Sequence, residues 1–242
     1  MRLITSSGKT LYVWKNIQLV KSRIALFMLL LMLALALFIL NKVPYSSLGL
    51  FLVPISYGLG VYSYKSYLAW RVGFLGEEAV KEVLRSLSDS YILLSGLVVP
   101  PNRGDIDYLV IGPNGIFVVE AKNYGGRISC DGDEWKKIKV GRGGSTYNLE
   151  IGSPSNQVKR SSKVLKDYIL AHQSDVFNGP APHIWVHGLL VFTNPDAEIE
   201  LKNPSVEVVD LDSLCDHILR TKSEYSLSPE EVERMGSLLS RI

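Results

Sequence analysis

The chain has 242 residues, a formal net charge of +2 at pH 7 and 47% hydrophobic residues. This length predicts one or two domains, and the near balance of charge points neither to a strongly basic nucleic-acid-binding protein nor to an acidic tail. The mean hydropathy is positive, which is unusual for a soluble protein and indicates a local apolar segment. Two cysteines, Cys130 and Cys215, provide no disulfide framework, which suits a reducing compartment.

The apolar segment lies near the N-terminus, at residues 24–40, which carry no charged or polar side chain. Its length is near the short end of the roughly 17–25 residues that cross a bilayer as a helix. Residues 43–64 form a second uncharged run, which is softer because it contains Pro, Gly and Ser. We interpret residues 24–64 as a hairpin of two transmembrane helices, with a re-entrant or interfacial segment as the alternative for the second run. A cleaved signal peptide fits the first run poorly, since no small-residue cleavage site follows it.

Positively charged residues near the two runs predict their orientation, because cytoplasmic flanks are enriched in Lys and Arg. Only Lys42 lies between the runs, whereas the flanks carry Lys9, Lys15, Lys21, Arg23, Lys65 and Arg71. Both termini should therefore be cytoplasmic, with a very short external turn. We expect a multi-pass protein of the plasma or inner membrane.

The rest of the chain predicts a short N-terminal segment, a connector and one α/β domain. Residues 1–23 are expected to be cytosolic with some β character at 10–14, and residues 65–72 form a basic and aromatic connector. Residues 73–242 form the domain, with its core at 73–194. Periodicity and turn signals place its helices and strands in chain order at 76–87, 91–99, 106–111, 116–121, 126–130, 154–172, 183–193, 206–209, 213–220 and 229–239. This order of elements predicts an α/β fold with a mixed sheet.

Two apolar strands of this domain carry carboxylates, and the turn between them decides where those carboxylates lie. The turn at 112–115 contains a Pro-Asn-Gly sequence, which favours a tight reversal. If it brings Ile111 opposite Ile116, Asp107 falls opposite Glu120, with Cβ atoms about 4.5–5.5 Å apart. Two carboxylates at that distance repel, and a hard cation between them removes the cost. A bulge at the turn would shift this register by one residue.

A lysine and a third carboxylate share the same strand faces. Lys122 lies two residues beyond Glu120, where an ammonium group can hold a phosphate oxygen or orient and help deprotonate a water. Metal-binding carboxylates with a lysine suit phosphodiester hydrolysis, in which a divalent ion generates the nucleophile. Asp105 shares the face of Asp107, so either can be the main ligand.

Helices on each side of the strands contribute two further polar candidates. Glu77 lies on the core-facing stripe of the helix at 76–87. A contact with the helix dipole or a cap would explain this position without a function, but the nearby carboxylates favour a functional role. Gln157 lies in the first turn of the helix at 154–172, beside its buried side, and could reach the same cleft.

Basic residues of the domain have two interpretations, a solvated surface or a track for phosphates. The candidates for contact with nucleic acid are Lys159, Arg160 and Lys163 of the later helix, and Lys136 and Lys137 of a Gly-rich segment. Trp135 in that segment could stack on a base or pack in the core.

The motifs Gly73-x-x-Gly76-Glu77, Gly104-Asp105-Ile106-Asp107 and the run from Gly112 to Asn123 resemble the nuclease-related domain (NERD) family. Segments 153–157 and 191–194 look similar to its downstream elements, so the resemblance covers about half of the chain. It implies the fold of the PD-(D/E)xK, restriction-endonuclease-like superfamily, a mixed sheet flanked by helices. One departure is that Ile106, and not Pro, precedes the first metal-binding aspartate.

The resemblance also implies roles for the residues described above. Asp107 and Glu120 would bind magnesium or manganese, and Lys122 would be the catalytic lysine. Glu77 and Gln157 would complete the site, and the substrate would be DNA. We therefore expect a membrane-anchored, divalent-metal-dependent nuclease that needs no small-molecule cofactor. The alternatives are a catalytically silent nucleic-acid-binding or scaffolding module and a membrane signalling or assembly protein.

Overall fold

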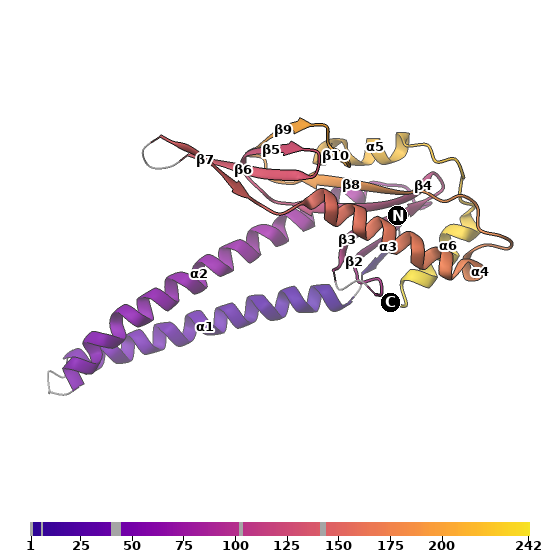
Figure 1. Ribbon diagram of the computed structural model, residues 1–242. Coiled ribbons are helices and arrows are strands. Elements are labelled where there is room, and N and C mark those ends of the chain that lie inside the picture. The colour runs from indigo at the N-terminus through magenta and orange to yellow at the C-terminus, as the bar shows by residue number, and fades with distance from the viewer. Residues whose placement is uncertain (1, 6, 40–44, 102–103, 141–143) are drawn as a thin grey trace. The chain divides into compact units, whose positions relative to one another are not determined.

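The computed structural model describes residues 2–5, 7–39, 45–101, 104–140 and 144–242 (Figure 1). The chain forms two compact units. Thr10–Leu75 make up one, and Met1–Lys9 join Gly76–Ile242 in the other. The N-terminal residues therefore belong to the same unit as the α/β domain.

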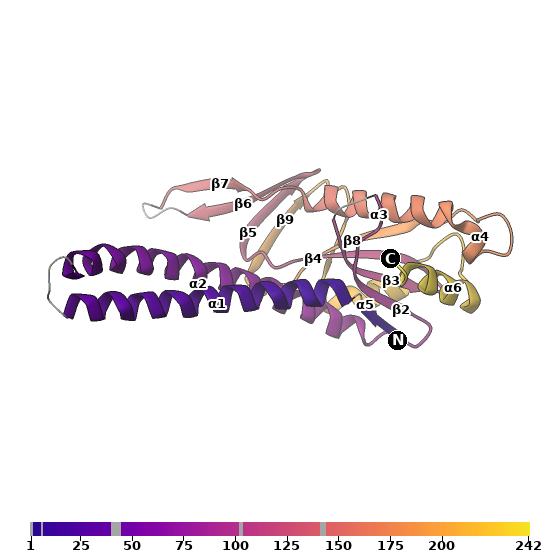
Figure 2. The same cartoon turned by 90° about the horizontal axis from the view of Figure 1, so that it is seen from below.

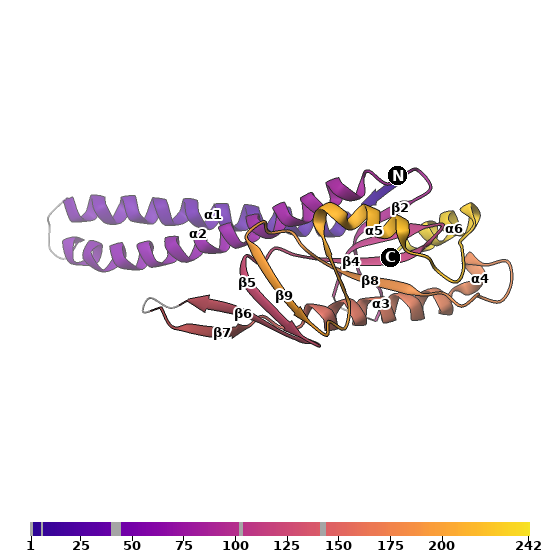
Figure 3. The ribbon, with the colours of Figure 1, turned by 90° about the horizontal axis from the view of Figure 1, so that it is seen from above.

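The smaller unit consists of parts of two long helices, α1 (Ser7–Ile39) and α2 (Tyr45–Leu84), which run side by side in Figures 2 and 3. Among the described residues, one stretch, Asn16–Ile39 of α1, is long and apolar enough to cross a membrane. Many of its large side chains are exposed, as is typical of a surface that faces lipid. A second crossing by α2 stays a prediction.

One local expectation for this region is wrong. The β character at residues 10–14 is not realised, because α1 already covers these residues and the strand lies earlier, at β1 (Arg2–Thr5). β-branched and aromatic residues favour strands only weakly, and extending a helix that has already formed outweighs that preference. The predicted connector, residues 65–72, forms part of helix α2.

The larger unit is built on a mixed sheet that contains six of the described strands, in the order β1-β2-β3-β4-β8-β10. Neighbours β2, β3 and β4 are antiparallel, whereas β1 with β2, β4 with β8, and β8 with β10 are parallel. Besides β1, its strands are β2 (Ile92–Leu97), β3 (Ile106–Gly112), β4 (Gly115–Lys122), β8 (Val186–Phe192) and β10 (Glu207–Asp210). The central position of β3 and β4, covered on both faces, explains their nearly continuous apolar sequence.

Helices cover the two faces of this sheet, so the predicted α/β architecture is confirmed. The helices α3 (Pro154–Ala171), α4 (Gln173–Val176) and α6 (Pro229–Leu239) pack on one face around Leu109 and Val118. The domain part of α2, the turn η1 (Leu211–Ser213) and α5 (Leu214–Arg220) cover the other face, around Phe117.

A second sheet, of four described strands in the order β7-β6-β5-β9, was not predicted as such (Figure 3). Its strands are β5 (Gly126–Asp131), β6 (Glu134–Val140), β7 (Thr146–Glu150) and β9 (Ala197–Lys202). Only β5 was expected from the sequence. The residues of β7 are all exposed, so this strand lacks the apolar alternation by which a half-buried strand is identified.

Candidate active site

The turn between β3 and β4 has the predicted register. Ile111 lies opposite Ile116, and Tyr108 lies opposite Val119, where the paired stretch ends. The turn is held in place by Asn114, whose Oδ1 accepts a hydrogen bond from the Tyr91 hydroxyl at 2.8 Å and whose amide donates to the Thr221 carbonyl at 3.1 Å. No bulge shifts the strands, so even and odd positions keep the faces that the sequence assigned to them.

This register brings the two carboxylates to the same edge of the sheet. Continued by one residue, it places Asp107 beside Glu120. Asp107 Oδ2 accepts a hydrogen bond from the backbone N–H of Ala121 at 2.9 Å, so its carboxylate lies against the end of β4. Both residues are buried, with 8% of Asp107 and 2% of Glu120 exposed. Carboxylates are seldom buried to this extent without a partner or a function.

Lys122 joins this pair from the last position of β4. Its Nζ donates to Glu120 Oε1 at 2.6 Å and to Gln157 Oε1 at 3.1 Å, and 18% of its side chain is exposed. Burial lowers the pKa of Lys122, but the charges of Glu120 and Asp107 outweigh that effect, and the net shift is upward. The ammonium group is therefore held in its charged form inside the site.

Gln157 reaches Lys122 because α3 begins beside the end of β4. The Ser153 side chain caps this helix by accepting from the Asn156 backbone N–H at 3.2 Å, and Pro154 occupies the first turn. The prediction that Gln157 reaches the same cleft as Lys122 agrees with this geometry. Its amide oxygen fixes one of the three N–H groups of the ammonium.

Glu77 and Asp105 are the two further predicted carboxylates, and both lie near this edge of the sheet. Gly76 packs so closely on Asn123 and Thr193 that a Cβ atom there would overlap the Thr193 side chain. The adjacent Glu77 is thus near the strand ends, and its backbone carbonyl accepts a hydrogen bond from the Tyr108 hydroxyl at 2.7 Å. Asp105, half-buried, precedes β3. The roles of these two carboxylates stay predictions.

The basic candidates do not gather at the acid–lysine site. Lys159 forms an ion pair with Asp133 at 2.6 Å, and Lys136 pairs with Glu134 at 3.2 Å. Lys137 is half-buried on β6, while Arg160 and Lys163 are exposed on α3. Trp135 is buried, and its Nε1 donates to Ser155 Oγ at 3.0 Å, so the packing interpretation is correct and base stacking is excluded.

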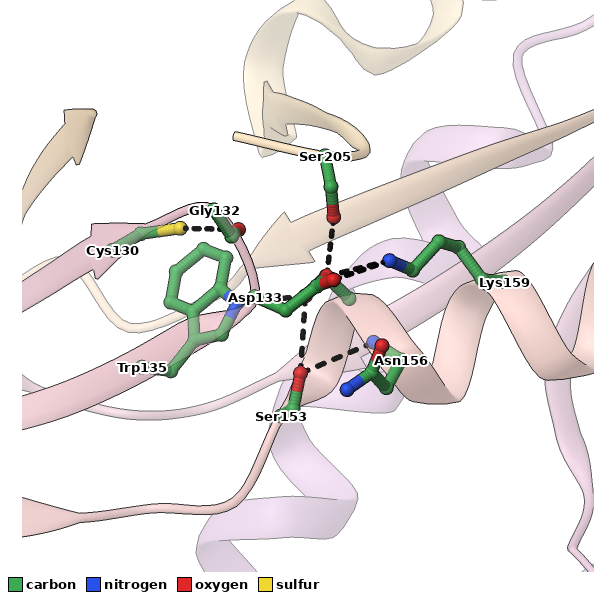
Figure 4. A network of polar contacts seen from close by, with 9 residues as sticks. Cys130, Gly132, Asp133, Trp135, Ser153, Asn156, Lys159 and Ser205 are labelled. Carbon is green, nitrogen blue, oxygen red and sulfur yellow. Dashed lines mark hydrogen bonds and ion pairs between the residues drawn. The ribbon is translucent and has the colours of Figure 1, made fainter. Parts of the chain in front are cut away.

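A polar network that the sequence did not reveal holds the start of α3 (Figure 4). Asp133, in the turn between β5 and β6, accepts hydrogen bonds from Lys159, from Ser155 Oγ at 2.8 Å and from Ser205 Oγ. Lys159, with Ser205 and Ser155, lowers the pKa of Asp133 to about 2. The network ties the second sheet to the helix turn that carries Gln157. An Asp in a Gly-Asp turn gives no sequence signal beyond the turn itself.

Comparison with known protein families identifies the family of this chain. The model of the nuclease-related domain (NERD) matches residues 72–193, which include both buried carboxylates, Lys122 and Gln157. The chain belongs to the nuclease-related domain family. A similar curated relative, an uncharacterized protein of Bacillus anthracis, is 44% identical over 63 residues, which make up 24% of this chain and 29% of that protein. No solved structure matches the chain.

The sequence predicts a divalent metal between Asp107 and Glu120, and the chemistry of these two carboxylates is compatible with one. Among the described residues no cluster of three or more His, Cys, Asp or Glu is arranged for a metal. Two neighbouring carboxylates are nevertheless enough for Mg²⁺, which usually keeps several waters and binds through one or two carboxylates. Within the described part of the chain, the buried Thr193 hydroxyl near this edge has no hydrogen-bond partner, so it is available to a bound water.

Replacing Asp133 by Asn should destabilise the protein at neutral pH and much less at low pH. The folded pKa of about 2 lies below the unfolded value near 3.9, so the ionised carboxylate stabilises the fold above about pH 4. That contribution is lost as the pH falls from about 4 to 2. Because the side chain is 38% exposed, we expect an effect of about 1 kcal/mol after screening by solvent. Denaturation midpoints of both proteins at pH 7 and pH 3 measure it, and an equal difference at both values would contradict the network.

Proposed function

We propose that this protein is a membrane-anchored, divalent-metal-dependent nuclease that hydrolyses DNA phosphodiester bonds. The observation that carries the proposal is the buried set at the end of β4, where Lys122 Nζ lies 2.6 Å from Glu120 and Asp107 lies alongside. Burying ionised groups costs several kcal/mol, and such clusters occur preferentially at functional sites. Membership of the nuclease-related domain family supports the same reaction class.

In the proposed site Asp107 and Glu120 hold Mg²⁺ or Mn²⁺, with Asp105 or Glu77 as a further carboxylate. A divalent ion at this position would supply an acidified water and would offset charge on the phosphate. Lys122 orients the attacking water or a phosphate oxygen. Gln157 keeps the ammonium group directed into the site by accepting one of its hydrogen bonds at 3.1 Å.

The strand pairing also supports anchoring by a hairpin with an even number of crossings. β1 precedes α1 in the chain and β2 follows α2, yet the two strands pair directly, with Leu3 opposite Leu93. Residues before α1 and after α2 must therefore lie on the same side of any membrane that the chain crosses. If Asn16–Ile39 spans the bilayer, α2 has to return, and the flanking Lys and Arg residues favour the cytoplasm for both ends.

Short epitope tags at the two ends of the chain should accordingly be found on the same, cytoplasmic side. We expect neither tag to be labelled in intact cells and both to be labelled after permeabilisation. A tag at the C-terminus that is accessible in intact cells while the N-terminal tag is protected would indicate a single crossing. That result would contradict both the hairpin and the pairing of β1 with β2.

A catalytically silent module that binds nucleic acid is the second candidate. The observation that favours it is the ion pair itself, since Lys122 and Glu120 compensate each other's charge at 2.6 Å. This candidate predicts salt-dependent DNA binding that survives Glu120→Gln, with no cleavage by either protein.

The deciding experiment is a cleavage assay on the full chain purified in detergent. The full chain is needed because a fragment that starts at Gly73 would lack β1 and leave the β2 edge unpaired. Plasmid and oligonucleotide substrates are incubated with Mg²⁺, with Mn²⁺ or with EDTA. Cleavage that requires the metal and is lost in Lys122→Ala supports the nuclease. No cleavage by wild type under any of these conditions, or equal cleavage by both proteins, refutes the catalytic proposal.

A further inference from the structure

A pocket of about 450 Å³ lies between α3 and the strands β8 and β10. β10 is an edge strand of the sheet. The volume of the pocket falls within the roughly 300–1,000 Å³ of typical small-ligand sites. Its lining includes Val158, Ser162, Lys163 and Lys166 of α3, Trp185 before β8, and Val206 before β10. None of them takes part in the acid–lysine site.

The pocket is on the other side of α3 from that site. Successive residues of a helix are separated by about 100°, so Lys166 projects roughly opposite to Gln157, which contacts Lys122. A ligand in the pocket therefore lies away from the buried carboxylates. The pocket is therefore separate from the acid–lysine site.

The floor of the pocket contains a polar atom without a protein partner. The hydroxyl of Ser162 is buried and, within the described residues, makes no hydrogen bond. It lies over Gly188 of β8, where a Cβ atom would come within 3.0 Å of Ser162 Oγ and would overlap Val158. A buried polar group is normally hydrogen-bonded. An unpartnered hydroxyl among Val158, Val186 and Val206 is therefore suited to a ligand that is mainly apolar but has a donor or acceptor.

The rim of the pocket is cationic and aromatic. Lys159 is neutralised by Asp133, but within the described part of the chain neither Lys163 nor Lys166 has a carboxylate partner. Lys166 Nζ lies 5.6 Å from the centroid of the Trp185 ring, and Trp185 is 57% exposed. The acidic residue of the lining, Glu207, interacts with His217 at 2.6 Å. The rim thus offers two ammonium groups next to an open aromatic face.

We infer that this pocket binds a nucleotide unit. A planar base would lie on the Trp185 face and the apolar floor, where stacking is tolerant of base identity. The phosphate would contact Lys163 and Lys166, and Ser162 would hydrogen-bond the base or the sugar. The unit can belong to a free nucleotide or to a single strand of nucleic acid. This site is additional to the proposed catalytic function and does not require cleavage.

Binding is tested with the full chain in detergent and EDTA, which prevents metal-dependent cleavage. The probes are a short fluorescent single-stranded oligonucleotide, followed by anisotropy, and unlabelled deoxyadenosine monophosphate as a competitor. We expect roughly tenfold weaker oligonucleotide binding by Trp185→Ala and by the pair Lys163→Glu and Lys166→Glu. Arg220→Glu is the matched control, because this exposed residue of α5 is on the other face of the sheet from α3 and does not line the pocket.

The outcomes separate the sources of the nucleotide. Competition by the monophosphate assigns the pocket to free nucleotides, and binding of the oligonucleotide alone assigns it to a strand; both support the site. Wild-type binding by the pocket variants, or an equal loss in Arg220→Glu, overturns it. The site is also overturned if the pocket variants lose binding to anionic lipid vesicles but keep wild-type binding to the oligonucleotide. Because cleavage is absent in EDTA, failure of the nuclease proposal would leave this result unchanged.

Discussion

Lys122→Ala is expected to lower metal-dependent DNA cleavage at least about a hundredfold, since a positioned acid–base or electrostatic group commonly contributes that much or more. We expect this large effect because the Lys122 ammonium group lies 2.6 Å from Glu120, a proposed metal ligand. Initial rates on a plasmid substrate, at saturating Mg²⁺, measure the effect. Glu120→Gln should lower the rate at least as strongly, because it removes a proposed metal ligand.

The matched control for this substitution is Lys81→Ala. Lys81 has the same side-chain exposure, 18%, and is also paired, with Glu78 of the same helix, α2, at 3.2 Å. Its cleavage rate should stay within about twofold of wild type. Thermal melting of each variant shows whether the fold is retained, since an unpaired buried charge destabilises. A folded Lys122→Ala protein that cleaves like Lys81→Ala would refute the catalytic assignment.

Trp135→Ala should have the largest effect on stability, a loss of about 3–5 kcal/mol. Trp135 is 2% exposed, packs against Phe192 with ring centroids 5.5 Å apart, and donates a hydrogen bond to Ser155. The substitution leaves a cavity between the second sheet and the main sheet, and it removes the donor to the first turn of α3. Urea denaturation of the full chain in detergent measures the change.

The same substitution at an exposed tryptophan provides the comparison. Trp185→Ala should change stability by less than about 0.5 kcal/mol, because its ring is open to solvent on the pocket rim. Similar denaturation midpoints for the two variants would show that Trp135 does not join the two sheets. The pair also separates the roles of the two residues, since only Trp185 is proposed to affect nucleotide binding.

The elements predicted best from the sequence are those with strong local signals. The Pro-Asn-Gly turn set Ile111 opposite Ile116, and this register alone brought Asp107 to Glu120. Helix α6 has the predicted bounds because Pro229 follows Ser228, whose capping box with Glu231 fixes the start. The position of Gln157 near the site was predicted from the helical spacing of the buried residues of α3.

Features that depend on distant partners were not predictable in the same way. β1 is only four residues long, and it is stabilised by pairing with β2, which follows it by many residues and two helices. The exposed strand β7 has no apolar alternation. Asp133 gains its role from Lys159 and Ser205, which reach it from separate elements. No local sequence pattern encodes these contacts between distant segments, because they depend on tertiary packing.

The most direct test of the metal-dependent site is the position of a bound ion. Crystals of the full chain grown with Mn²⁺ should show anomalous scattering at one position in contact with both Asp107 and Glu120. Expected oxygen distances are near 2.1 Å, and Lys122 Nζ should be displaced from its 2.6 Å contact with Glu120 Oε1. An ion bound elsewhere, with the Lys122–Glu120 pair intact at saturating Mn²⁺, would contradict the assignment.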